Sequence, residues 1–175
     1  QKSMDLQKAA MQEDIPAWRE GRAKIVESFG ERVIDQSFAR TFDSLVTASG
    51  ALELRVVNME RESGYITASG TPLPPDVLEP MQMDAFWAKC EAMGYDPADF
   101  EPGSGNSVNV DSYHTLILYQ NKTVTFTFSL VKQKEEQTKV KARASGINYP
   151  PILAEMYKAL WREMDRQLYM DKQLD

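Results

Sequence analysis

The strictly alternating segment at residues 123–131 (TVTFTFSLV) constrains the fold of this 175-residue chain more than any other feature. Successive side chains of a strand point to opposite faces, so the segment predicts a strand with one apolar and one hydroxyl-rich face. Its apolar side chains are Val124, Phe126, Phe128 and Leu130. Residues 138–145 (TKVKARAS) alternate again, with a basic row formed by Lys139, Lys141 and Arg143. The two segments indicate an antiparallel sheet with one face packed and one face in water.

Four further segments have strand-like patterns and bring the expected sheet to about six strands. They are residues 32–38, 52–59, 65–69 and 113–119 (YHTLILY). Residues 149–171 carry a continuous apolar stripe at helical spacing that includes Met156, Leu160, Trp161 and Met164. Such a helix spans roughly 30 Å, enough to cross a small sheet. We therefore predict a two-layer α+β sandwich in which helices cover the sheet and the C-terminal helix lies across it.

The expected domain organisation is a flexible N-terminal tether followed by one domain. Residues 1–14 are polar and charged, and residues 15–175 have the length of a single α+β domain. Two origins fit a chain that begins at Gln1. It is either an exported protein trimmed after a signal sequence or a segment that starts inside a longer chain.

Composition argues against several classes of site. The chain has one cysteine and one histidine, which excludes an internal disulfide, a cysteine zinc cage and any multi-histidine metal centre. A net charge of −6 disfavours a nucleic-acid partner held by basic charge. No run of 18 apolar residues is present, so no membrane-spanning helix is expected.

The single cysteine and the single histidine are best interpreted as structural residues rather than catalytic ones. Cys90 lies on the apolar stripe of an expected helix, and His114 lies on an expected strand without a nucleophile motif around it. The acidic loop at residues 96–111 lacks the spacing of a calcium-binding loop. We therefore expect no catalytic residue, no cofactor and no metal. The basic row of Lys139, Lys141 and Arg143 is either a contact surface for an acidic partner or lipid head groups, or the solvated face of the sheet.

Residues 33–69 resemble a known family. A strand leads to a helix near Phe42, a second strand at 52–59, a charged turn and the segment GYITAS. This order, with a G-x-I-x-A motif at Gly64 to Ala68, resembles bacterial envelope lipoproteins, including the BamC-like components of the outer-membrane β-barrel assembly machinery. The resemblance implies no catalytic residues. It implies a lipid anchor just before Gln1, a place on the periplasmic side of the envelope at the outer membrane, and an envelope protein or membrane surface as partner.

The function expected from these features is non-catalytic binding or scaffolding in the cell envelope. The alternative is a helix-grip domain, similar to Bet v 1 and START-type proteins, that holds an apolar ligand between sheet and C-terminal helix. It predicts a cavity of about 300 Å³ or more. Its wall is expected to consist of Val124, Phe126, Phe128, Leu130, Met156, Leu160 and Met164.

Overall fold

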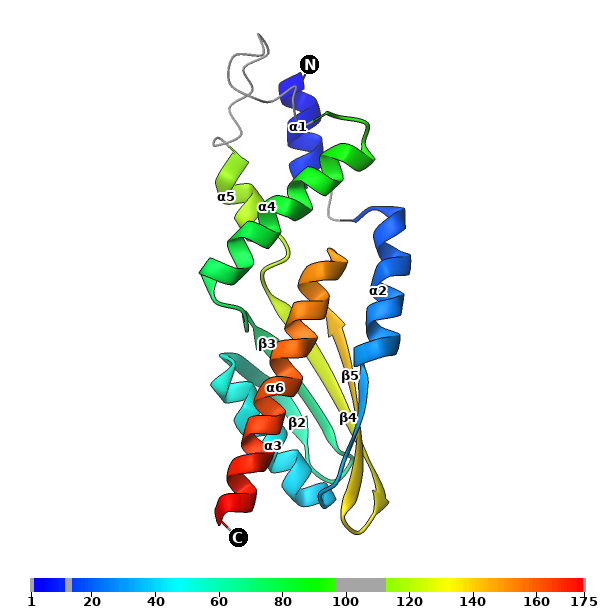
Figure 1. Ribbon diagram of the computed structural model, residues 1–175, viewed down its shortest axis with the longest axis vertical. Coiled ribbons are helices and arrows are strands. Elements are labelled where there is room, and N and C mark those ends of the chain that lie inside the picture. Colours follow the sequence, from blue (N-terminus) through cyan, green and yellow to red (C-terminus); the bar gives the residue numbers. More distant parts are fainter. Residues whose placement is uncertain (1, 12–13, 97–112, 175) are drawn as a thin grey trace.

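The computed structural model describes residues 2–11, 14–96 and 113–174. Within them the chain forms a five-stranded antiparallel sheet with the strand order β1-β5-β4-β3-β2. Its strands are β1 (Glu31–Ile34), β2 (Leu54–Glu60), β3 (Tyr65–Gly70), β4 (Val124–Lys134) and β5 (Gln137–Ser145). The helices are α1 (Lys2–Met11), α2 (Pro16–Phe29), α3 (Phe38–Ala51), α4 (Pro75–Ala92), α5 (His114–Tyr119) and α6 (Pro150–Leu174). Figure 1 shows the sheet and α6 in one half of the elongated molecule and α1, α4 and α5 in the other.

The predicted α+β fold is confirmed: helices cover one face of an antiparallel sheet, and the long C-terminal helix α6 packs across it (Figure 1). At the centre, the Phe126 ring meets the Tyr157 ring edge to face at 5.5 Å. The Tyr157 hydroxyl donates a hydrogen bond of 2.8 Å to the Ala142 carbonyl of β5. The indole nitrogen of Trp161 likewise donates to the Phe29 carbonyl at 2.7 Å. Apolar burial and these hydrogen bonds together fix the helix over the sheet. We call β1–β5 with α2, α3 and α6 the sheet body.

Register places the alternating side chains as the sequence predicts. Phe126 lies opposite Ala68 of β3 and Ala144 of β5. The basic row of β5 falls on the other face of the sheet, which no helix covers in Figure 1. There Lys139 forms a 3.0 Å ion pair with Glu31 of β1. This uncovered face is polar, as expected for an antiparallel sheet with one wet side.

The stretch expected to be a flexible tether is a packed helix over most of its length. Leu6, Ala9 and Ala10 of α1 are buried against Phe86 and Cys90 of α4 and Ile117 of α5. We call this group, formed by α1, the C-terminal half of α4 and α5, the helical cap. Small and apolar residues at positions 6, 9 and 10 recur at helical spacing, which gives α1 one side to bury.

The strand expected at residues 113–119 is wrong, because the structure forms helix α5 at His114–Tyr119. This accounts for five strands in place of six. In a helix, Tyr113, Leu116 and Ile117 lie on one side, and all three pack in the helical cap. Packing against α1 and α4 thus overrides the strand preference of the local sequence.

Helix α4 begins at Pro75, inside the proline-rich stretch at residues 70–80. Proline suits the first helical turn because the amide hydrogens there lack intrahelical partners. The N-terminal half of α4 contributes Leu78 to the core of the sheet body, whereas Phe86 and Cys90 belong to the helical cap. The loop predicted beyond residue 96, with most of its acidic side chains, lies outside the described residues.

Candidate binding site

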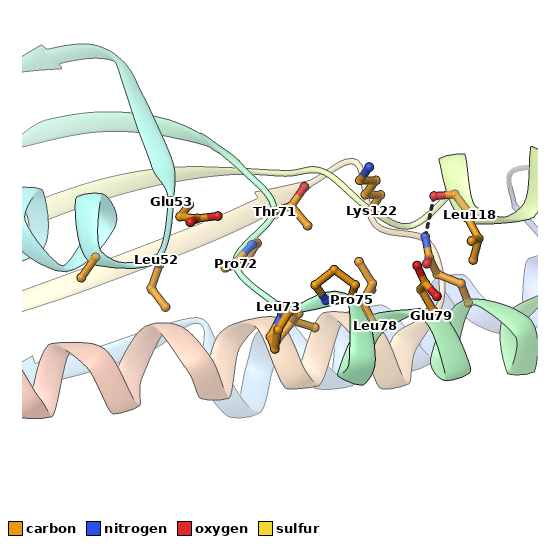
Figure 2. Close-up of a pocket in the computed structure, with 13 residues that line it drawn as sticks. Leu52, Glu53, Thr71, Pro72, Leu73, Pro75, Leu78, Glu79, Leu118 and Lys122 are labelled. Carbon is orange, nitrogen blue, oxygen red and sulfur yellow. Dashed lines mark hydrogen bonds between the residues drawn. The ribbon is translucent and has the colours of Figure 1, made fainter. Parts of the chain in front are cut away.

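A cavity of about 550 Å³ lies where the sheet body meets α4 and α5. We call it the junction pocket; Figure 2 shows the residues around it. Three stretches far apart in sequence form its wall: the end of α3 with the turn that leads to β2, the β3–α4 connection with the first turns of α4, and the end of α5 with the α5–β4 connection. Its lining residues are Ala51, Leu52, Glu53, Thr71, Pro72, Leu73, Pro74, Pro75, Leu78, Glu79, Gln82, Leu118 and Lys122. The volume lies in the range of about 300–1,000 Å³ that is typical of small-molecule sites.

The wall of the pocket is predominantly apolar and rigid. Leu73 and Leu78 are 7% and 3% exposed and belong to the core of the sheet body, so they cannot turn away from the pocket without disturbing that core. Proline side chains form much of the β3–α4 connection, and proline fixes the backbone φ angle. Leu52 and Leu118 face the space from opposite ends in Figure 2. This wall is therefore formed before any ligand arrives.

Three charged side chains stand at the rim. Figure 2 places Glu53 at the end next to Leu52, and Glu79 and Lys122 at the other end, near Leu118. All three are exposed. In the described part of the chain, none of the three has an ion-pair partner. Their charges therefore remain available to a molecule in the pocket.

The backbone holds Glu53 in an unusual conformation. Its φ angle of 59° lies in the left-handed region, where glycine is favoured. The turn that ends α3 requires this angle: the Glu53 amide donates to the Gly50 carbonyl at 3.1 Å as the chain enters β2. Gly70 of β3 packs against the Glu53 carbonyl, and a β-carbon there would approach the oxygen to 2.3 Å. The Glu53 backbone is thus tightly fixed while its carboxylate is exposed at the rim.

A buried amide fixes the α5 side of the pocket. Gln82 is 3% exposed, and its side-chain nitrogen donates to the carbonyls of Leu118 and Gln120 at 2.9 and 2.8 Å. The next residue, Asn121, also has a positive φ angle, of 55°. Its side-chain oxygen accepts hydrogen bonds of 2.9 Å from the amides of Asn148 and Tyr149. These bonds hold the end of α5, and hence Leu118 and Lys122, against α4 and the start of α6.

The seven residues expected to line an apolar ligand cavity are all buried in the sheet body. Each is at most 3% exposed, and the Phe126 and Phe128 rings stack at 5.7 Å. They pack together in the core of the sheet body, and the junction pocket is lined by other residues. The set is Val124, Phe126, Phe128, Leu130, Met156, Leu160 and Met164.

The remaining residues singled out in the sequence also lie away from the pocket. Lys139, Lys141 and Arg143 are on the uncovered face of the sheet. His114 is exposed at the start of α5. Cys90 is fully buried in the helical cap, and burial raises the pKa of its thiol to about 11. The structure therefore brings none of these side chains to the junction pocket.

Sequence reasoning missed the junction pocket because its residues come from three separated stretches. The available signal was the run GTPLPPDVLEP, whose prolines mark a rigid connection with apolar side chains between them. The positive φ angle of Glu53 could not be predicted from its residue type, because glycine, asparagine and aspartate are the usual residues with positive φ angles.

In residues 2–11, 14–96 and 113–174, no three side chains of histidine, cysteine, aspartate or glutamate are grouped to hold a metal ion. None of the described helices combines the length and apolarity needed to cross a membrane.

Comparison with known proteins leaves the site to be judged on its own geometry. No family model, no curated protein and no solved structure matches this chain.

Proposed function

We propose that this protein is a non-catalytic binding protein of the bacterial cell envelope and that the junction pocket is its binding site. The observation that carries the proposal is the pocket itself, a preformed apolar cavity of about 550 Å³ with a few charged groups at its rim. Apolar walls with a small number of polar groups are the usual form of a ligand site.

The residue types around the pocket support binding rather than catalysis. Among the residues described there, polar side chains are limited to Glu53, Thr71, Glu79, Gln82 and Lys122. Acyl transfer through a covalent intermediate generally needs a nucleophile within hydrogen-bond reach of a base that a third group orients. The described lining offers no serine, cysteine or histidine for such an arrangement.

Placement in the cell envelope, with a lipid anchor, rests on the resemblance of residues 33–69 to envelope lipoproteins. The test is to express the full-length gene product in a bacterial host with a clickable palmitate analogue and to fractionate the membranes. We expect fatty-acid labelling and recovery with the outer membrane. An unlabelled protein in the cytosolic fraction would overturn this part of the proposal and leave the pocket to be judged separately.

Binding at the pocket is tested with N-phenyl-1-naphthylamine, an uncharged apolar dye that fluoresces when it leaves water. Ala51 is exposed at the end of α3 and lines the pocket, so Ala51→Trp fills the cavity without cutting the core. The matched control is Gly50→Trp, because Gly50 is exposed on the same helix and has open space around it.

We expect the wild type and Gly50→Trp to enhance the dye fluorescence equally, and Ala51→Trp to lose most of the enhancement. Equal enhancement by all three proteins would place dye binding elsewhere and overturn the assignment of the pocket.

A further inference from the structure

Among the described residues, two non-glycine residues have positive φ angles, and different features explain them. At Asn121 the side chain accepts hydrogen bonds from two backbone amides, and asparagine tolerates this conformation well. At Glu53 the side chain has no ion-pair partner among the described residues, and glutamate is poorly suited to the conformation. The contacts of the fold therefore explain Asn121 and leave the carboxylate of Glu53 without a structural role.

The position of Glu53 suggests what its carboxylate does. It is exposed at one end of an apolar cavity whose walls include Leu52, Leu73 and Leu78 (Figure 2). The other two charged side chains of the rim, Lys122 and Glu79, lie toward the opposite end in Figure 2. Among the described lining residues, Glu53 is thus the charged side chain at its own end of the pocket, and that end is negative.

We propose that the junction pocket binds small cationic amphiphiles, with the apolar part against the leucine and proline wall and a primary ammonium group beside the Glu53 carboxylate. This rests on the proposed binding function and names its ligand class. The apolar wall supplies most of the affinity, because burial of apolar surface stabilises in proportion to area. The carboxylate supplies the choice of head group. An exposed ion pair changes affinity by about threefold, so the expected selectivity is modest and falls with added salt.

Three probes with the same chain separate these contributions: octylamine, 1-octanol and octanoate, each titrated below its micellar concentration at pH 7 and low ionic strength. Isothermal titration calorimetry then gives an affinity for a cationic, a neutral and an anionic head group. We expect octylamine to bind about threefold more tightly than octanol, and octanoate to bind more weakly than either.

Substitutions assign the selectivity to one side chain. Glu53→Gln removes the charge with little change of shape, so it should bring octylamine to the affinity of octanol and leave octanol unchanged. Glu62→Gln, in the exposed β2–β3 turn, makes the same change of net charge away from the pocket and should keep the wild-type order. Lys122→Gln should raise the affinity for octylamine, by at most about twofold, because it removes a like charge from the rim.

Glu53→Gly distinguishes the effect of the carboxylate on binding from the effect of the backbone conformation on stability. Glycine relieves the left-handed conformation, so the thermal midpoint should rise by about 2 °C while the preference for octylamine disappears. A higher thermal midpoint together with a lost preference for octylamine is expected only if the Glu53 carboxylate binds the ligand and does not stabilise the fold.

The outcomes are distinguishable. Equal affinity for all three probes, or a preference for octanoate, would overturn the ligand class and leave the binding function standing. Unchanged selectivity in Glu53→Gln would overturn the role of Glu53. Failure of every probe to bind, together with failure of the uncharged dye, would remove the pocket as a binding site.

Discussion

The sheet body and the helical cap are built on very different scales. Among the described residues, the body buries one continuous cluster of 23 apolar residues, drawn from all five strands, from α3, α4 and α6 and from two connections. The described part of the cap buries a separate cluster of six. Strands distant in sequence are joined by ladders of hydrogen bonds in the body, whereas the cap relies on three helices packed side by side. Local opening is easiest where buried apolar contacts are few, so the cap should open without the body.

The largest expected effect is the loss of a central ring from the body. Phe128→Ala should lower the free energy of unfolding by about 3–5 kcal/mol, because a fully buried ring is replaced by a cavity. Urea unfolding followed by circular dichroism measures the change. The control is Ser129→Ala on the uncovered face, where a change below about 0.5 kcal/mol is expected. Equal effects from both variants would contradict the assignment of the core.

A cavity in the cap should cost less and act locally. Leu6 of α1 is fully buried, so Leu6→Ala should destabilise the cap by about 2–3 kcal/mol. Hydrogen exchange should speed up in α1 and α5 and stay unchanged in β3, β4 and β5. Met4→Ala, which alters an exposed residue of the same helix, is the control. Exchange that accelerates equally in the central strands would show that cap and body open as one unit.

The link between cap and body should respond to acid. Asp14 pairs with Arg22 at 2.8 Å, and Arg22 also donates to the Asn148 carbonyl just before α6. The hydrogen bonds from Arg22, more than those from Arg19, lower the pKa of Asp14 from 3.8 to about 2. A carboxyl group whose pKa is lower in the folded than in the unfolded protein stabilises the fold at pH values above the unfolded pKa. This contribution is lost as pH falls from about 4 through about 2.

Asp14→Asn should therefore be less stable than wild type at pH 5, by an amount below about 1 kcal/mol, and should converge with it near pH 2. Denaturant unfolding across this range measures the difference. Glu20→Gln, which removes the exposed pair with Lys24, makes the same change of charge. A difference in stability between Asp14→Asn and wild type that grows as pH falls would have the opposite sign and would refute the stabilising role of the Asp14 carboxylate.

The smallest effect concerns reactivity rather than stability. Cys90 is buried in the cap with a thiol pKa raised to about 11, so at pH 8 roughly one thiol in a thousand is ionised. A disulfide reagent such as 5,5′-dithiobis(2-nitrobenzoate) should label it slowly, through opening of the cap. Labelling should be faster than global unfolding and faster still in Leu6→Ala. Labelling at the global unfolding rate would mean that the cap has no opening of its own.

The body could be predicted from sequence because its signals are local and redundant. Alternation at Val124, Phe126 and Phe128 specifies both a strand and its buried face, and the apolar stripe of α6 specifies the surface that covers it. In the cap, Leu116 and Ile117 favour a strand by themselves, and only contact with α1 and α4 makes them helical. The segment 113–119 was mispredicted for that reason.

The junction pocket was beyond prediction for a related reason. Leu52, Leu73 and Leu118 come to line one pocket only after the sheet has formed and the cap has docked beside it. Each is an ordinary apolar residue in its own segment. The left-handed conformation of Glu53 arises from the turn between α3 and β2 and from the approach of Gly70, and neither is visible in a single window of sequence.

Helix α4 contributes residues to both cores, so a substitution that suits one core also affects the other. Leu78 packs in the sheet body and Phe86 in the cap, about two turns further along the same helix. A substitution that shifts the helix to improve one core therefore also moves residues of the other. Substitutions in the two cores are therefore coupled during evolution. A substitution beside Phe86 can change the shape of the junction pocket without altering any residue that lines it.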